Sequence, residues 1–173
     1  MAILPILKYP DPKLKENSKK VAVFDDALKT LAADMAETML DAPGAGLAAP
    51  QVGCLLRLIV IAGAENDENF DDRVITLVNP QIVWSEGEQT YDEGCLSVID
   101  YNEKVIRAGA VEVQAQDLDG KPLTIKAEGR RAVILQHEID HLDGILFIDR
   151  ISQLKRDIYK RKLKKIIKEA ANG

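Results

Sequence analysis

The chain has 173 residues, 46% of them hydrophobic and 29% charged, which is the composition of a soluble globular protein of one-domain length. No apolar run approaches the roughly 20 residues that span a bilayer. The N-terminal segment has neither a basic region nor a long apolar stretch, so no secretory signal is predicted. We therefore expect a cytoplasmic protein with a single catalytic domain over residues 1–173.

The first half of the chain predicts one helix followed by strands. A cap at Asp25 or Asp26 begins a helix that Pro43-Gly44 ends. A small-residue loop over residues 44–51 and a buried strand over 55–62 follow. Residues 64–72 predict an acidic loop, and two strands separated by Asn79-Pro80 are expected at 74–78 and 81–84. The buried face of the helix is predicted from apolar residues at helical spacing, which are Leu28, Leu31, Met35 and Met39.

The second half predicts a hairpin and two helices. Residues 105–116 alternate in places and lead through an Asp119-Gly120 turn into 122–127. Residues 129–142 predict a helix with Gly144 as its C-terminal cap. A last helix is expected at about residues 152–170, with apolar side chains at helical spacing, which are Leu154, Ile158, Ile166 and Ile167. The order of elements predicts the α+β class.

The segment His137-Glu138-Ile139-Asp140-His141 fits the H-E-x-x-H pattern and contains both histidines of the chain. Residues four apart lie on one face of a helix, so the two imidazoles can bind one metal ion. The glutamate beside the first histidine can then reach a water on that metal and act as a general base. The pattern alone also arises by chance on buried helices. The predicted fold has mixed or antiparallel sheets around this central metal-binding helix, with the C-terminal helix beyond it.

A catalytic metal usually takes three protein ligands and keeps one position open. The chain has no third histidine, and the nearest downstream acids, Asp143 and Asp149, stand at no recognised spacing. Upstream, Cys95 is the best candidate, because a thiolate and two imidazoles make a tetrahedral site with a vacancy. The alternative for a lone cysteine is a buried structural thiol. Cys54 competes for the role, but it precedes an apolar strand and is expected to be packed.

Three segments together resemble the peptide deformylases. They are Gly-Ala-Gly-Leu-Ala-Ala-Pro-Gln at 44–51, Glu-Gly-Cys-Leu-Ser at 93–97, and Gln-His-Glu-Ile-Asp-His-Leu-Asp-Gly at 136–144. The resemblance covers nearly the whole chain and leaves only the C-terminal helix loosely specified. It implies an enzyme of protein biosynthesis that hydrolyses the formamide of N-formylmethionyl peptides, which yields formate and a free amine.

The resemblance also implies a set of roles. Cys95, His137 and His141 would bind one divalent metal, most often Fe2+, with Zn2+, Ni2+ or Co2+ as alternatives. Metal coordination lowers the pKa of water from about 16 towards about 7, which makes hydroxide available to attack the formyl carbon. Glu138 would be the general base and acid. The Gln51 side chain and the Leu96 backbone N–H would donate to the formyl oxygen.

Substrate contacts are implied in the same way. Ala45, Gly46 and Gly94 would pair with the peptide as an added strand, which recognises an extended chain without reading its sequence. A Gly-x-Gly segment seen alone is as readily a plain helix-to-strand loop. The methionine side chain would enter an apolar pocket at Val133 and Ile134. Which residues are preferred after formylmethionine is left open.

Three further residues match family positions that steady the ligands, namely Glu93, Arg107 and Asp140. Metal-bound histidines usually have such support, and a structural ion pair is the alternative. The chain departs from the family pattern at Ile99, where a proline is usual two residues after Ser97. The shape of the loop beyond Ser97 is therefore open.

The C-terminal helix is basic, with eight Lys and Arg against two acids from Ser152 onward. Its local charge of +6 leaves −11 on the remainder of a chain whose net charge is −5. The favoured interpretation is an amphipathic helix docked through Leu154, Ile158 and Ile166, with a solvated basic face. The alternative is contact with the ribosome, whose RNA is polyanionic. No membrane or DNA partner is predicted.

Two other functions are less consistent with the sequence. A zinc endopeptidase would need a downstream third ligand, which the sequence lacks. A deformylase-like fold without catalysis would be expected to have lost Gln51, Cys95 or Glu138, and all three are present. The oligomeric state is not predicted.

Overall fold

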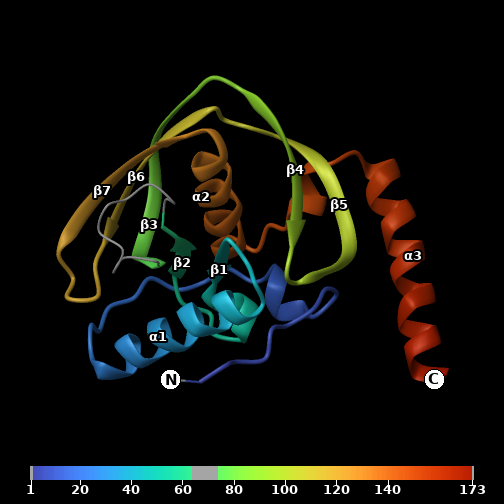
Figure 1. Ribbon diagram of the computed structural model, residues 1–173, viewed down its shortest axis with the longest axis horizontal. Coiled ribbons are helices and arrows are strands. Elements are labelled where there is room, and N and C mark those ends of the chain that lie inside the picture. The colour runs from blue at the N-terminus through green and yellow to red at the C-terminus, as the bar shows by residue number, and fades with distance from the viewer. Residues whose placement is uncertain (1, 64–73, 173) are drawn as a thin grey trace.

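The computed structural model describes residues 2–63 and 74–172. Helix α2 (Gly129–Leu142) lies between two sheets, with α1 (Asp26–Asp41) on the far side of the larger sheet and α3 (Gln153–Asn172) at the edge of the molecule (Figure 1). The larger sheet is antiparallel in the order β1-β2-β3-β6-β7, and the smaller one is the hairpin β4–β5. The strand bounds are β1 Gly46–Ala48, β2 Leu58–Ala62, β3 Val74–Glu86, β4 Gln89–Cys95, β5 Val98–Arg107, β6 Ala110–Gln116 and β7 Pro122–Glu128. This arrangement is the predicted α+β class.

Strand β2 shows why the larger sheet has an apolar core on both faces. Alternate side chains of a strand point to opposite faces. Ile59 and Ile61 pack in the cluster that contains α2, whereas Leu58 and Val60 pack in the cluster that contains α1. A strand covered on both sides reads as a continuous apolar run, which is why this strand was predicted.

Helices α1 and α2 begin and end near the predicted residues. The side chain of Asp25 accepts a hydrogen bond from the Leu28 N–H at 3.0 Å and caps α1. Asp143 caps the end of α2, and the next residue, Gly144, has a φ of +71°. A Cβ at Gly144 would lie 2.4 Å from the Lys15 carbonyl oxygen, so only glycine fits this turn.

Three strand predictions need correction. The loop predicted at 44–51 contains β1 and a short 3-10 helix, η2 (Ala49–Val52). The strands predicted on either side of Asn79-Pro80 form one strand, β3, with a register shift between Val78 and Gln81. Asn79 has a φ of +51°. Its side-chain oxygen accepts from the Val21 N–H at 2.8 Å and its side-chain NH2 donates to the Val21 carbonyl at 3.0 Å. The next residue, Pro80, has no N–H to donate to the ladder.

The strand predicted over 105–116 spans two elements, because β5 ends at Arg107 and β6 begins at Ala110. The hairpin β4–β5 was not predicted, whereas the β6–β7 hairpin was. The predicted acidic loop at 64–72 lies outside the described residues. None of the described helices is long and apolar enough to cross a membrane.

The predicted docking face of α3 is wrong at Leu154 and Ile158, whereas Ile166 is half-buried. Leu154 and Ile158 are 70% and 54% exposed, and the buried residues are Tyr159 and Leu163. They join a cluster with Phe147 and with Val98 of β5. The short 3-10 helices η1 (Pro12–Lys15) and η3 (Phe147–Arg150) contribute to the same cluster. The helix therefore docks through a face one residue away from the predicted stripe.

This corrected face can be tested with two substitutions on α3. Leu163→Ala should lower the free energy of opening α3 by about 2–5 kcal/mol, because it removes a buried side chain. Ile158→Ala should change it by no more than about 0.5 kcal/mol, because that side chain is exposed. Hydrogen exchange of the α3 backbone amides measures both. If the free energy of opening falls equally in the two variants, or falls more for Ile158→Ala, the originally predicted docking face would be correct.

Candidate metal centre and active site

Three potential metal ligands from two segments converge in the structure. His137 and His141 stand four residues apart on α2, and Cys95 is the last residue of β4. His141 Nε2 lies 3.3 Å from His137 Nε2 and 3.4 Å from Cys95 Sγ. The ligand atoms all lie within 4.8 Å of one another. These three residues form a metal-binding site.

The spacing suits a single ion. A tetrahedral zinc with S and N ligands at ordinary bond lengths requires N···N of about 3.3 Å and S···N of about 3.6 Å. The observed separations of 3.3 and 3.4 Å are close to these values. Cys54 does not belong to the site, since it packs against the α1 cluster. Asp143 and Asp149 pair with Arg57 and Lys15 respectively and are not ligands either.

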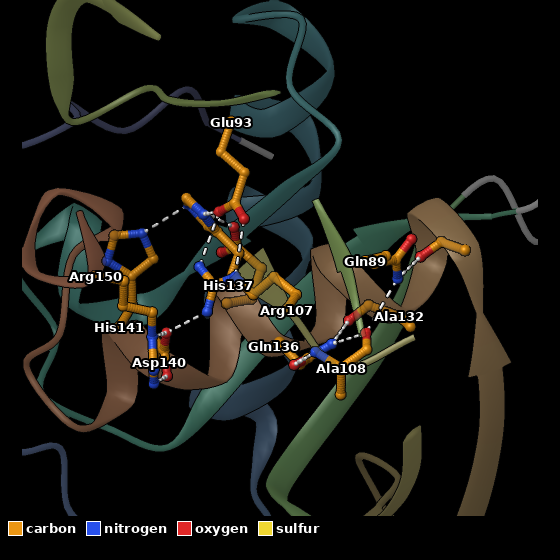
Figure 2. A network of polar contacts seen from close by, with 12 residues as sticks. Gln89, Glu93, Arg107, Ala108, Ala132, Gln136, His137, Asp140, His141 and Arg150 are labelled. Carbon is orange, nitrogen blue, oxygen red and sulfur yellow. Dashed lines mark hydrogen bonds and ion pairs between the residues drawn. The ribbon is translucent and has the colours of Figure 1, made fainter. Parts of the chain in front are cut away.

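Glu93 fixes the orientation of the first histidine. Its Oε1 lies 2.9 Å from His137 Nδ1 and accepts a 2.8 Å hydrogen bond from Arg107, whose Nε donates to Oε2 at 2.8 Å. Figure 2 shows the carboxylate between the histidine ring and the guanidinium. With Nδ1 engaged in this way, Nε2 is the nitrogen that faces the other ligands. Such carboxylate–histidine contacts typically orient metal ligands.

Asp140 extends this network to the protein surface. It accepts from Arg107 at 2.6 Å and from Arg150 at 2.5 and 2.8 Å (Figure 2). Glu93, Arg107 and Asp140 were predicted as supports, and they lie together in the structure. Arg150, the last residue of η3, lies ten residues from its partner and was not predicted. No local pattern marks an arginine for such a contact.

The Cys95 sulfur lies next to two donors. The Ser97 N–H and Gln51 Nε2 each lie 3.5 Å from Sγ. Gln51 is oriented by its carbonyl oxygen, which accepts from the Ala48 N–H at 2.9 Å, and its Nε2 also donates to Ser97 Oγ at 3.1 Å. The side-chain amide is therefore held with its NH2 group towards the metal site. Ser97, fully buried, was not singled out from the sequence.

Glu138 is buried beside the ligands without a hydrogen bond to Oε2 among the described residues. Its Oε1 lies 3.7 Å from His137 Nε2. Gly46 allows this position, because a Cβ there would lie 2.8 Å from Glu138 Cγ. Burial raises the pKa of Glu138 to about 7. A bound dication would favour the ionised carboxylate and lower that pKa.

The two histidines differ in their electrostatics. Burial, together with the neighbouring His137, lowers the pKa of His141 well below its ordinary value. For His137 burial also lowers the pKa, but contacts with Cys95 and Glu93 outweigh burial and raise it well above the ordinary value. Metal coordination needs both rings neutral, so binding of an ion displaces the proton that these acidic neighbours hold on His137.

Cys95 and His137 line a cleft of about 420 Å³, and the buried His141 adjoins them. One wall is formed by residues 43–46, which lead into β1, and another by β4. Within the described residues, β1 pairs only with β2 and β4 only with β5, so each offers a free strand edge. The cleft is lined by all the residues predicted to bind the peptide, which are Ala45, Gly46, Gly94, Val133 and Ile134. The two predicted donors to the formyl oxygen, Gln51 and Leu96, line it as well.

The fold and the site define a metal-dependent hydrolase. One sulfur and two imidazole nitrogens surround a single point, and a buried carboxylate and an open cleft adjoin it. This donor set leaves a position for water or substrate, as catalytic sites require.

The comparisons identify the family. The family model of the polypeptide deformylases matches residues 3–157 of the chain. The chain therefore belongs to the polypeptide deformylase family. The peptide deformylase of Syntrophobacter fumaroxidans is 53% identical, over 98% of this chain and 99% of that protein. A crystal structure of the Legionella pneumophila enzyme has a TM-score of 0.89 and 48% identity, and covers 99% of each chain. The Ehrlichia chaffeensis enzyme in complex with actinonin has a TM-score of 0.87 and 39% identity, over 95% of this chain and 98% of that chain.

The contact between Glu93 and His137 generates a prediction about metal affinity. Glu93→Gln should weaken metal binding by about 10- to 100-fold, because it removes the charge that orients the ring. Glu103→Gln is a matched control, since Glu103 lies opposite Glu93 in the β4–β5 ladder but pairs with Lys155 at the surface. Competition with a chromophoric chelator measures both affinities. Equal affinities of the two variants would contradict the role of Glu93.

Proposed function

We propose that the chain, acting as one catalytic domain in the cytoplasm, removes the formyl group from the N-terminal formylmethionine of nascent polypeptides and releases formate. The observation that carries this is the convergence of Cys95, His137 and His141 beside Glu138, in a cleft bordered by two free strand edges. Family membership supports the reaction class. The roles of individual residues are the proposal.

Cys95, His137 and His141 would hold one divalent ion. Fe2+ is the first candidate, and Zn2+, Ni2+ and Co2+ suit the same donors, since thiolate and imidazole do not by themselves select among them. When bound, the ion supplies a Lewis acid and lowers the pKa of water. Glu93, Arg107 and Asp140 would keep the ligands in position without touching the substrate.

Glu138 would move the proton. Its carboxylate lies beside His137 Nε2, within reach of a water at the ligand atoms. It would accept the proton of that water as the formyl carbon is attacked and deliver it to the leaving amine. Burial favours the protonated form of Glu138, whereas a nearby dication favours the ionised form. The carboxyl group is therefore suited both to accepting the proton from water and to donating it to the amine.

The formyl oxygen gains negative charge during attack and needs donors that are fixed in advance. Gln51 Nε2 would be one. This Nε2 donates to Ser97 Oγ at 3.1 Å and lies 3.5 Å from Cys95 Sγ, so donation to the formyl oxygen would replace one of these two contacts. The backbone N–H of Leu96, in the turn after Cys95, would be the second. Loss of one such donor typically costs about 100- to 1,000-fold in rate.

The rest of the peptide would lie between β1 and β4 as an added strand. Ala45 and Gly46 on one wall and Gly94 on the other would pair with its backbone, and Val133 and Ile134 would receive the methionine side chain. Backbone pairing is indifferent to sequence, which suits an enzyme that processes many different nascent chains.

The first test is formate release from an N-formylmethionyl tripeptide by protein that is purified without oxygen and loaded with Fe2+. Glu138→Gln should reduce turnover by at least about 100-fold, because a positioned base contributes that much, while the bound metal content stays unchanged. Glu128→Gln, an exposed glutamate at the start of α2, is the control and should keep full turnover. No formate with metal bound would refute the function, and cleavage of internal peptide bonds would point to an endopeptidase.

We also propose that α3 contacts the ribosome. Because Tyr159 and Leu163 dock the helix, most of its lysines remain exposed. Lys164, Lys165 and Lys168 lie beyond the last buried residue, so they are available to a polyanionic surface.

Charge reversal tests this contact without removing the docking residues. Replacing Lys164, Lys165 and Lys168 with Glu should weaken ribosome association and reduce its salt slope by about one per lysine that meets a phosphate. Turnover of a free tripeptide should be unchanged. The same change at Lys104, Lys121 and Lys126, exposed on the strands or their turns, controls for net charge. Equal effects of the two triple variants in cosedimentation would exclude a specific contact.

A further inference from the structure

One face of α2 continues beyond the metal site to the rim of the cleft. Arg130 is on the first turn of the helix, four residues before Ile134, and Ile134 is three residues before His137. All three line the same cleft. Residues three or four apart share a helix face, so a charged residue, an apolar residue and a metal ligand follow one another along one wall.

The spacing of this wall matches that of an extended peptide. Four residues of helix rise by roughly 6 Å. Side chains two residues apart in a strand point the same way and stand roughly 6.6 Å apart. We take the peptide to run along α2 towards the N-terminus of that helix. With its methionine side chain at Val133 and Ile134, it would then present the side chain of its third residue near Arg130. The second side chain would point to the opposite side.

Arg130 is the one lysine or arginine among the described residues that line the cleft. It is exposed, and within the described part of the chain its guanidinium forms no ion pair. Of the acids that line the cleft, Glu93 is paired with Arg107 and Glu138 lies at the metal end. Asp92, on β4, is exposed and also lines the cleft, but it forms no ion pair with Arg130 within the described part of the chain.

We propose that Arg130 is a specificity-determining residue, which favours formylmethionyl peptides with Asp or Glu as the third residue. The guanidinium is a planar fork whose geometry matches a carboxylate. Its position at the start of α2 adds the positive end of the helix dipole. The inference rests on the proposed function, because it takes the methionine pocket and the added strand as given.

The experiment compares kcat/KM for amidated tetrapeptides, formyl-Met-Ala-X-Ser, with X as Glu, Gln or Lys. Amidation removes the terminal carboxylate that would otherwise compete for Arg130. The wild-type enzyme should favour Glu over Gln by about two- to fivefold, which is the range of an exposed ion pair. The preference should shrink as salt rises. Moving the glutamate to the second position should abolish it.

Three variants test whether the preference depends on a positive charge at residue 130 in particular or on the net charge of the protein. Arg130→Gln should bring the Glu-to-Gln ratio to about one, and Arg130→Glu should reverse the order in favour of Lys. Arg131→Gln removes the same charge from the next residue, which does not line the cleft, and should keep the wild-type ratio. The reversal is a result that a merely structural role would not produce.

Two negative results are distinguishable. If the wild-type enzyme releases formate from all three peptides at equal rates, or if Arg131→Gln loses the preference as much as Arg130→Gln, the role of Arg130 is overturned. If the Gln peptide yields no formate with metal bound, the proposed function itself is wrong and this inference falls with it.

Discussion

Helix α2 lies between two sheets, so the polar side chains on its inner faces cannot reach bulk water and must find partners within the protein. An unpaired buried charge costs several kcal/mol. Asp140 meets this requirement with two arginines, and His137 Nδ1 meets it with Glu93. His137 Nε2 and His141 Nε2 face the sulfur of Cys95, and Glu138 Oε2 and His141 Nδ1 have no hydrogen bond among the described residues. The metal site is where the remaining polar atoms of this helix converge.

The helical repeat explains how much of the site could be predicted. Two histidines and a glutamate lie within five residues, so the geometry of a helix determines their relative positions. Helix α2 spans the predicted range. Cys95 came from a process of elimination and from the resemblance, because no local rule connects it to His137, 42 residues further along the chain. Arg150 and Ser97 were missed for the same reason. Their partners are set by tertiary packing, and each residue is unremarkable in its own segment.

The strands were predicted well where burial is strong on both faces and poorly where it is not. β2 is apolar throughout, whereas β5 mixes Tyr101 and Val105 with charged residues and gives only a weak alternating pattern. Yet the poorly predicted elements form the cleft, since β4 and the three-residue strand β1 provide its open edges. Open edges invite association with other chains, so most are kept short or covered. Here they border the cleft that contains the metal-binding site.

Ile99 illustrates how tertiary contacts can substitute for local stiffness. The family resemblance predicts a proline at this position, which would restrict the backbone just after the metal ligand. In its place the Tyr159 hydroxyl of α3 donates to the Ile99 carbonyl at 2.9 Å. The Tyr159 ring packs on Tyr101, which stacks on Phe147, and Phe147 in turn stacks on the His137 ring. A continuous row of aromatic rings thus joins the C-terminal helix to a metal ligand. The four rings come from four different segments of the chain. Their contacts therefore depend on the tertiary fold, and no sequence pattern within one segment predicts them.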